Sequence, residues 1–309
     1  MRISTNTIYQ SGTNQLMSLQ TDLNKLSIQT ATGKRVNSPA DDPVAAARLL
    51  ELNTAKDLNA NFGSTRKTAE TLLQTYETSL TNVTDTIQAI QSSVIAAGNG
   101  TYTDSERTKV ANELQGYLDT LVNLANSKDS QGNYMYAGYA TQTVPFELDT
   151  STTPNRYVYK ANPTRTELQV DIQSQRSVTY TGDQIFGPNG ANVFKTLQDM
   201  ITLLKTPITD STTQATYSAG VGSTIDQMQG WLNNVLDARS EIGSNLNFID
   251  TMNTTGDSLD YQYDASISEL QDLDYAQALS DISKKTSILQ AAQKAFVATS
   301  NISLFSLIS

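Results

Sequence analysis

Apolar side chains recur at alternating steps of three and four residues in two stretches at opposite ends of the chain. This spacing places them on one face of a helix that expects a partner helix. The carboxyl-terminal stretch, residues 267–305, has no proline or glycine, but two of the six positions of its repeat, Thr286 and Gln293, are polar. The sequence therefore predicts that the two ends pair weakly, side by side. The expected interface residues are Leu16, Leu19, Leu23, Leu26, Tyr275, Leu279, Ile282, Leu289 and Phe296.

Three inner stretches, residues 73–94, 111–125 and 225–249, carry the same periodicity with apolar side chains at nearly every step. They predict an antiparallel helical bundle with a continuous core. We expect the last helix to end near Gly256, a short helix capped by Asp257 to follow, and a further helix to start after residues 272–274. The residues expected in the bundle core are Leu80, Val83, Ile87, Ile90, Leu232, Val235, Ile242 and Leu246.

Two polar clusters mark helix starts. Asp41-Asp42-Pro43 precedes a helical pattern, where an aspartate oxygen accepts from free backbone N–H groups and proline fits the first helical position. The paired carboxylates also suggest a metal or acid–base site, but no further ligand is visible nearby, so capping is favoured. Thr103 and Glu106 have the spacing of a capping box. Residues 129–133 are interpreted as a turn rather than a calcium loop, because the remaining spaced acids are missing.

The middle of the chain contains short segments rich in Tyr, Thr and Val, separated by Pro, Asn and Ser. Partial alternation in residues 134–139, 156–160, 168–172 and 178–181 predicts a small unit of antiparallel strands. Tyrosines can stack on a nucleic acid or a sugar, but basic residues do not alternate with them here. Packing across strands is therefore the favoured interpretation.

Together these elements predict a mainly α fold, a long antiparallel coiled coil and helical bundle built from both chain ends, with a small inserted β domain. Three domains are expected. Residues 1–43 and 265–309 would form a terminal coiled-coil domain, residues 44–133 and 194–264 a helical bundle domain, and residues 134–193 an inserted β-rich outer domain.

Composition narrows the function. The net charge of −10 comes from 31 acidic and 21 scattered basic residues, which disfavours nucleic acid or an anionic membrane as a partner. The chain has no histidine and no cysteine, so Ser-His-Asp and Cys-His nucleophiles, disulfides and the usual zinc sites are excluded. No window has the apolar length of a secretory signal or a membrane span.

Few kinds of catalytic site are compatible with a chain that lacks histidine and cysteine. A glycosidase needs a pair of carboxylates in a pocket, and the acids of the β region show no pocket-forming context. We therefore expect neither an enzyme nor a cofactor, while a sugar-binding role of the β region stays open. The acids in question are Asp149, Glu167, Asp171 and Asp183.

Short motifs occur near both chain ends. Residues 32–42, with the sequence TGKRVNSPADD, are similar to the Ser-Gly-x-Arg-x-Asn-Ser-x-x-Asp-Asp stretch of bacterial flagellins. Residues 273–280, LDYAQALS, together with Lys284 and residues 288–292 resemble the carboxyl-terminal segment of the same proteins. The residues that carry the motif are Gly33, Arg35, Asn37, Asp41, Asp42, Asp274, Ala276 and Gln290. Both chain ends therefore resemble the flagellin superfamily.

Within the superfamily the chain resembles a junction subunit more than filament flagellin, which is the alternative. The resemblance rests on the start MRIST, the order Asp41-Asp42-Pro43, residues 132–139 followed by Pro145-Phe146, and the ending SLF at 303–305. Residues 235–243 resemble a stretch that both kinds of protein share.

This resemblance implies a secreted, non-enzymatic structural subunit that serves motility. Such a subunit would be exported unfolded by the flagellar type III system with the help of an export chaperone. It would self-associate into a ring at the hook–filament junction of the extracellular flagellum. Its neighbours there would be hook-associated protein 1 on one side and flagellin on the other.

Overall fold

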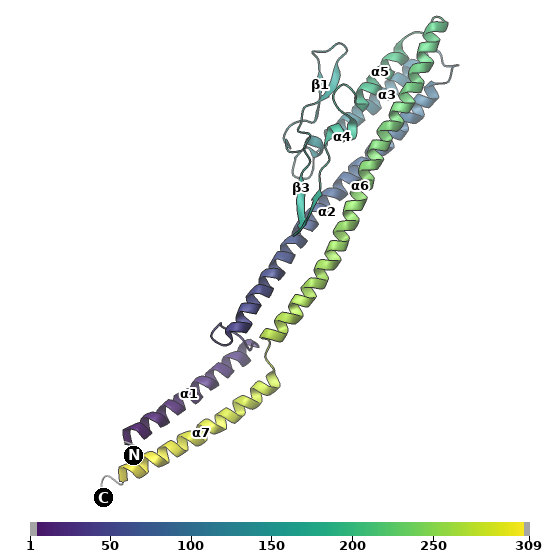
Figure 1. Ribbon diagram of the computed structural model, residues 1–309. Coiled ribbons are helices and arrows are strands. Elements are labelled where there is room, and N and C mark those ends of the chain that lie inside the picture. The colour runs from purple at the N-terminus through teal and green to yellow at the C-terminus, as the bar shows by residue number, and fades with distance from the viewer. Residues whose placement is uncertain (1–4, 306–309) are drawn as a thin grey trace. The chain divides into compact units, whose positions relative to one another are not determined.

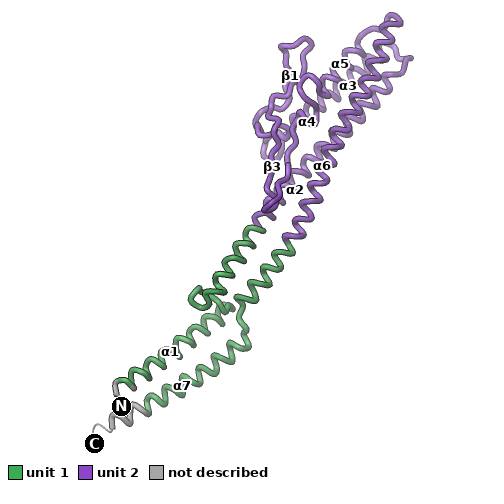
Figure 2. The backbone as a smooth tube through the Cα atoms, in the orientation of Figure 1, with its two compact units in different colours: residues 1–59, 257–309 green, residues 60–256 purple. Residues whose placement is uncertain are grey.

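A computed structural model describes residues 5–305, and it divides the chain into two compact units (Figures 1 and 2). The terminal unit comprises residues 1–59 and 257–309, and the central unit comprises residues 60–256. The fold is mainly α with two small antiparallel sheets, which confirms the predicted fold class. Residues 1–4 of the motif MRIST and residues 306–309 of the expected terminal domain lie outside the described residues.

In the terminal unit, α1 (Thr5–Thr32) and α7 (Tyr275–Phe305) lie side by side and antiparallel (Figure 1). The rings of Tyr9 and Phe296 are 5.3 Å apart near one end of the pair. Lys285 Nζ forms an ion pair with Asp22 Oδ2 at 2.6 Å further along it. The first part of α2 (Pro43–Ala97) pairs in the same way with the last part of α6 (Ser211–Gln271), where Lys56 meets Asp264.

The central unit is a bundle of α2, α3 (Asp104–Ala125), α5 (Val193–Lys205) and α6. Arg239 of α6 pairs with Glu77 of α2 at 2.6 Å, and the Tyr217 hydroxyl donates to the carbonyl of Ala97 at 2.5 Å. These contacts pair rising residue numbers on α2 with falling numbers on α6, so the helices are antiparallel. Of the eight expected core residues, Leu246 is partly buried, and the exposed fraction does not exceed 8% for Leu80, Val83, Ile87, Ile90, Leu232, Val235 and Ile242.

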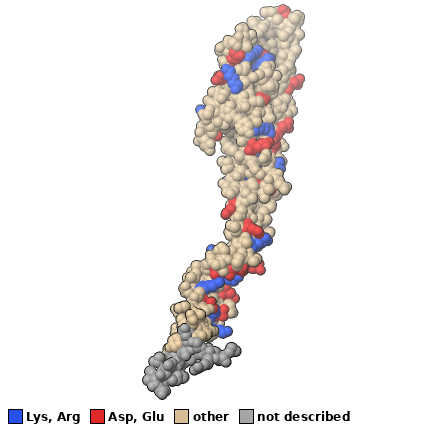
Figure 3. Space-filling view, turned by 60° about the vertical axis from the view of Figure 1, so that its left-hand side comes forward, with Lys and Arg blue, Asp and Glu red and all other residues tan. Residues whose placement is uncertain are grey.

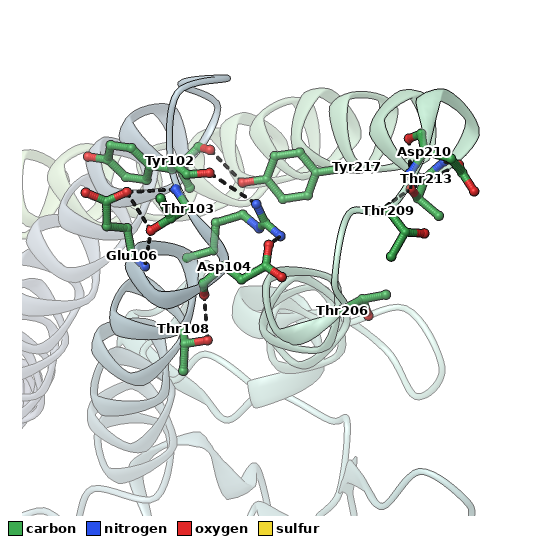
Figure 4. A network of polar contacts seen from close by, with 12 residues as sticks. Tyr102, Thr103, Asp104, Glu106, Thr108, Thr206, Thr209, Asp210, Thr213 and Tyr217 are labelled. Atoms are coloured by element: carbon green, nitrogen blue, oxygen red, sulfur yellow. Dashed lines mark hydrogen bonds and ion pairs between the residues drawn. The ribbon is translucent and has the colours of Figure 1, made fainter.

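Local capping chemistry begins two of these helices. Thr103 and Glu106 form the predicted capping box at the start of α3: Thr103 N donates to Glu106 Oε2 at 2.7 Å, and Glu106 N donates to Thr103 Oγ1 at 3.3 Å (Figure 4). Asn192 caps α5 by accepting from Lys195 N at 2.8 Å. The side chains thereby satisfy N–H groups that the helix itself leaves free.

The expected end of a helix near Gly256 is wrong, because α6 continues without interruption to Gln271. Gly256 is buried inside the helix, and Asp257 lies within it rather than at the start of a new one. A glycine costs a helix only about 1 kcal/mol, which tertiary packing readily overrides. The expected restart after residues 272–274 is correct, since α7 begins at Tyr275.

The β segment contains two separate antiparallel hairpins. β1 (Phe146–Asp149) pairs with β2 (Arg156–Tyr159), and β3 (Glu167–Asp171) pairs with β4 (Ser174–Ser177). A short helix α4 (Gly182–Phe186) follows. The prediction of antiparallel strands is thus correct in kind, although β1 was not among the predicted segments, and 178–181 lies just after β4.

The expected strand at 134–139 is a single 3-10 turn, η1 (Met135–Ala137). All three of its residues are buried, so the apolar and aromatic content that suggests a strand instead fills the core. Gly138 closes the turn with φ 58°, and a Cβ there would lie 2.1 Å from the carbonyl oxygen of Asn162. Only glycine tolerates this backbone position without strain.

The β segment shares its core with the bundle. The ring of Tyr76 on α2 contacts the rings of Tyr136 and Tyr180, each at 5.6 Å between centroids. Buried Arg66 of α2 donates to Asn253 Oδ1 of α6 at 2.7 Å and to the Val170 carbonyl of β3 at 3.2 Å. The structure consequently has two compact units, whereas the sequence predicts three; the predicted division into three stays a prediction for the assembled protein.

Candidate functional site

The motif residues near both chain ends meet in the terminal unit, where residues 33–42 lie against residues 270–274. Gly33 ends α1 in the left-handed conformation, with φ 71°, as expected for a glycine after a helix. A Cβ at this position would lie 2.9 Å from the hydroxyl of Tyr275, the first residue of α7. Leu273 N donates to the carbonyl of Gly33 at 3.0 Å. The end of α1 is therefore fixed directly against the start of α7.

Arg35 makes the central connection of this site. Its backbone N–H donates to the Gln271 carbonyl at 2.6 Å, and its Nη2 donates to the Leu270 carbonyl at 2.7 Å. Its Nη1 reaches Asp42 Oδ2 at 3.2 Å. Because the last carbonyls of a helix have no partner inside the helix, a guanidinium there satisfies groups that α6 leaves free.

Asp41 organises the loop from the other side. One carboxylate oxygen accepts from Ser38 N at 2.9 Å, Ser38 Oγ at 3.1 Å and Asn37 N at 3.2 Å, and the other pairs with Lys25 Nζ at 3.0 Å. The hydrogen bond from Lys25, followed by the one from the Ser38 backbone, lowers the pKa of Asp41 to about 2. The carboxyl group is therefore ionised at neutral pH and ties the loop to α1.

Asp42 and Asp274 cap the two helices that leave the site. Asp42 Oδ1 accepts from Ala45 N at 3.0 Å, and this bond together with Arg35 lowers the pKa of Asp42. Asp274 Oδ1 accepts from Gln277 N at 3.1 Å. Capping is thus the local role of Asp42, as the sequence predicts for this helix start, whereas the Asp41 carboxylate binds N–H groups of the loop instead.

A small apolar cluster lies under the loop. Val36, Ala45 and Leu49 are buried, and Ile267 and Leu270 of α6 pack against them. Gln29 of α1 is also buried, and its Nε2 donates to the Arg35 carbonyl at 2.6 Å. The loop is therefore an ordered part of the terminal unit that joins α1, α2, α6 and α7.

We refer to the surfaces of α1 and α7 that face each other as the terminal seam. Leu16, Leu19, Leu23 and Leu26 are only half-buried in it, as are Ile282, Leu289 and Phe296. Leu279 is 55% exposed, and the neighbouring Ala278 is 3% exposed instead. The assignment of Leu279 to the seam is thus wrong by one residue, because the covered positions of α7 include 278, 282, 285, 289, 292 and 296.

The two helices leave much of their apolar surface uncovered. An open groove of about 1030 Å³ follows α1 and is completed by α7. Its walls include Leu16, Met17 and Leu23 of α1 and Ile282 and Gln293 of α7. Tyr275 and Ile288 of α7 are 50% and 43% exposed. A helix of similar amphipathic character would bury this surface.

The remaining motif residues have other surroundings. Asn37 Nδ2 donates to the Lys34 carbonyl at 3.0 Å and so helps to shape the loop. Ala276 and Gln290 lie on exposed parts of α7. Lys25 and Gln29 were missed from the sequence, because their partners Asp41 and Arg35 come near only when the chain folds back. Ser38 stands inside the motif itself, directly after Asn37, which is a signal that could have identified it.

Metal ligands, membrane spans and surface charge bear on the class of site that the described residues can form. No group of three acidic residues within 5–305 is arranged to hold a metal ion. None of the helices in the described part of the chain is long and apolar enough to cross a membrane. On the face that Figure 3 shows, basic side chains lie beside acidic ones and form no continuous basic patch.

Comparison with known proteins adds sequence evidence. The chain matches the bacterial flagellin N-terminal helical region over residues 3–141. It is 34% identical to flagellar hook-associated protein 3 of Escherichia coli K12, in an alignment that covers 99% of each chain. Flagellin 1 of Proteus mirabilis is 24% identical over 67% of this chain and 60% of its own length. The hook-associated relative is thus more similar in both identity and coverage.

Solved structures share the fold. A putative flagellar hook-associated protein from Vibrio parahaemolyticus has a TM-score of 0.68 at 24% identity, covering 75% of this chain and all of its own. The flagellar junction protein from Legionella pneumophila has a TM-score of 0.63 at 19% identity, covering 73% of this chain and all of its own. At these identities the likeness establishes the common fold.

Proposed function

Because this chain belongs to the flagellar hook-associated protein 3 family, we propose that it is the structural subunit that joins hook-associated protein 1 to the flagellin filament. The observation that carries the proposal is the 34% identity to the Escherichia coli protein over 99% of both chains. Filament flagellin is the weaker alternative, since the flagellin relative aligns at lower identity and over a smaller part of both chains.

The terminal seam supports a role in assembly. Its leucines are only half-buried, and the adjoining groove of about 1030 Å³ is open. Burying apolar surface contributes roughly 25 cal/mol per Å², so contacts with neighbouring subunits would stabilise these helices further. We infer that sister copies form a ring in which the terminal helices complete their packing, with hook-associated protein 1 and flagellin on its two sides.

The loop at residues 33–42 also supports a role in assembly. Arg35 binds the end of α6, Asp41 ties the loop to Lys25 of α1, and Asp274 caps the start of α7, through the bonds described above. A fixed connection presents both terminal helices in one defined arrangement, so less ordering is needed when subunits meet. We therefore assign to the loop a positioning role in assembly.

The proposal extends to export and location. The subunit would leave the cell unfolded through the flagellar type III system, accompanied by an export chaperone, and would act at the extracellular hook–filament junction. A weakly stable terminal seam suits this route, since segments that order on binding pay their entropic cost at that moment. The proposed role is non-enzymatic and needs no cofactor, in keeping with a chain that lacks histidine and cysteine.

A deletion strain of the source bacterium tests the junction role. We expect the strain to be non-motile, to carry hooks without filaments in electron micrographs and to release unpolymerised flagellin into the medium. The full-length gene supplied in trans should restore filaments. Normal filaments in the deletion strain would disprove the proposal.

Seeded growth separates the junction subunit from a filament flagellin. Purified chain at high concentration is mixed with short filament fragments, and purified flagellin serves as the matched control. Flagellin should extend the fragments, whereas this chain should add at most a short terminal layer. Continuous filament growth from this chain would favour the flagellin alternative.

A further inference from the structure

Two asparagine–glycine pairs occur in the sequence, Asn99-Gly100 and Asn189-Gly190. In such a pair the backbone nitrogen of the glycine can attack the amide carbon of the preceding side chain, because glycine has no Cβ to obstruct the approach. The two pairs are chemically alike. Their different surroundings in the central unit therefore decide which of them reacts.

Asn99 lies in the exposed turn between α2 and α3. Its Oδ1 accepts from Thr101 N at 3.2 Å and Thr101 Oγ1 at 3.0 Å. Water can take over both bonds because these groups are exposed, so rotation of the side chain costs little. A Cβ added to Gly100 would meet no atom within 4 Å, and the same holds for Gly190, so the hydrogen bonds of the asparagine side chain, and not the space beside the glycine, distinguish the two pairs.

Asn189 is held by a bidentate pair of hydrogen bonds. Its Oδ1 accepts from Tyr159 N at 2.6 Å, and its Nδ2 donates to the Tyr159 carbonyl at 3.0 Å. Tyr159 is the last residue of β2 and is only 9% exposed. Moving the amide carbon of Asn189 toward Gly190 N would break both bonds and leave two poorly hydrated backbone groups without partners.

We propose that Asn99 is a site of spontaneous deamidation in the folded protein and that the fold protects Asn189. Gly100 N loses its proton and bonds to Cγ of Asn99, and the side-chain nitrogen leaves as ammonia. The five-membered imide that results adds one water. Opening at one carbonyl gives aspartate and opening at the other gives isoaspartate, and no oxidant or cofactor is consumed.

The product would change the α2–α3 turn and leave the core alone. It adds a negative charge to the turn that leads into the acidic first turn of α3, which already contains Asp104 and Glu106. Figure 4 shows the capping residues that follow the turn. The Tyr102 N–H, which donates to the Asn99 carbonyl at 3.2 Å, would have to adjust when isoaspartate lengthens the backbone.

The test follows both sites in one molecule. Purified full-length chain is aged in mildly alkaline buffer, and its peptides are mapped by mass spectrometry with separation of aspartate from isoaspartate. Asn99 should convert at least roughly tenfold faster than Asn189, the ratio expected for two hydrogen bonds of ordinary strength. In chain held unfolded by denaturant, both sites should convert at similar rates.

A substitution at Gly100 tests the attack of its backbone nitrogen on Asn99 directly. Gly100→Ala places a methyl group beside the attacking nitrogen where the fold has room for it, so conversion at Asn99 should slow severalfold while the melting temperature stays unchanged. Equal rates at Asn99 and Asn189 in the folded chain would overturn the proposal. So would an Asn99 that converts in denaturant but stays intact in the folded protein.

Discussion

The ring of Phe296 on α7 meets the ring of Tyr9 on α1 edge to face, with centroids 5.3 Å apart and planes at 77°. The same phenylalanine lies over Gly12, where a Cβ would come within 2.6 Å of its ring. Edge-to-face pairs add about 1 kcal/mol beyond the area they bury. This contact, far from the loop at residues 33–42, fixes how the two terminal helices align.

Phe296→Ala should loosen the terminal pair. Loss of about 1 kcal/mol should raise amide exchange in α1 roughly fivefold in the isolated monomer, with no change in the central unit. Gly12→Ala alone should also destabilise the pair by collision with the ring. In the Phe296→Ala background the same substitution should stabilise α1, because alanine favours helix by about 1 kcal/mol. Additive effects of the two changes would contradict the assigned contact.

Arg35→Lys should loosen the contact between the loop at residues 33–42 and the end of α6. An ammonium group cannot reach both the Leu270 carbonyl and Asp42 as the guanidinium fork does. We expect the loss of about 1–2 kcal/mol, seen as roughly tenfold faster exchange of Leu273 N–H. Arg48→Lys is the matched control, since Arg48 is 64% exposed and pairs with nearby Glu51 on the same helix. Equal effects of the two substitutions on this exchange rate would contradict the role assigned to the Arg35 guanidinium.

Asp41 should make the loop sensitive to acid. Its pKa is lowered to about 2, so its contribution to stability is complete above the ordinary carboxyl pKa near 4 and disappears as the pH falls toward 2. In Asp41→Asn the loop should be weaker than in the parent at neutral pH, and the difference should vanish near pH 2. Direct titration by NMR checks the cause. An ordinary pKa for Asp41 would show that Lys25 and Ser38 do not hold its carboxylate.

Leu289→Asp should separate assembly from stability of the central unit. A charge in the half-buried terminal seam weakens the α1–α7 pair and its contacts with neighbouring subunits. We expect the variant to fail to restore motility to the deletion strain, while the melting of the central unit stays unchanged. Ile288→Asp adds the same charge at an exposed position of the same helix. It should leave the α1–α7 pair of the isolated monomer intact, so a weaker pair in Leu289→Asp alone would show that the position in the seam matters. Full motility with Leu289→Asp would contradict the proposed use of the seam.

Val83→Asp should unfold the central unit. Val83 is fully buried, and an unpaired carboxylate in an apolar core costs more than about 3 kcal/mol. The expected result is a large fall in melting temperature or no soluble folded protein. Ile95→Asp lies on the same helix but is 59% exposed, so its melting temperature should stay close to that of the parent. A parental melting temperature for Val83→Asp would refute the core position.

The sequence by itself determined the elements whose signals are local. Helical periodicity marked the core positions of α2 and α6, Asp42 and Thr103 marked helix starts, and Gly33 marked a helix end, since each depends on neighbours a few residues away. The fold class followed, because two long amphipathic ends of one chain bury their apolar faces most simply against each other.

Only the tertiary structure decided the features that depend on distant residues. It placed Ala278 rather than Leu279 in the terminal seam, carried α6 past Gly256 and made residues 135–137 a buried turn. It also brought Lys25 to Asp41 and Arg35 to the end of α6. A single packing contact or hydrogen bond between distant residues is worth about as much as a local preference, about 1 kcal/mol. Several such contacts act on the same segment in the folded chain, so their sum prevails where the two disagree.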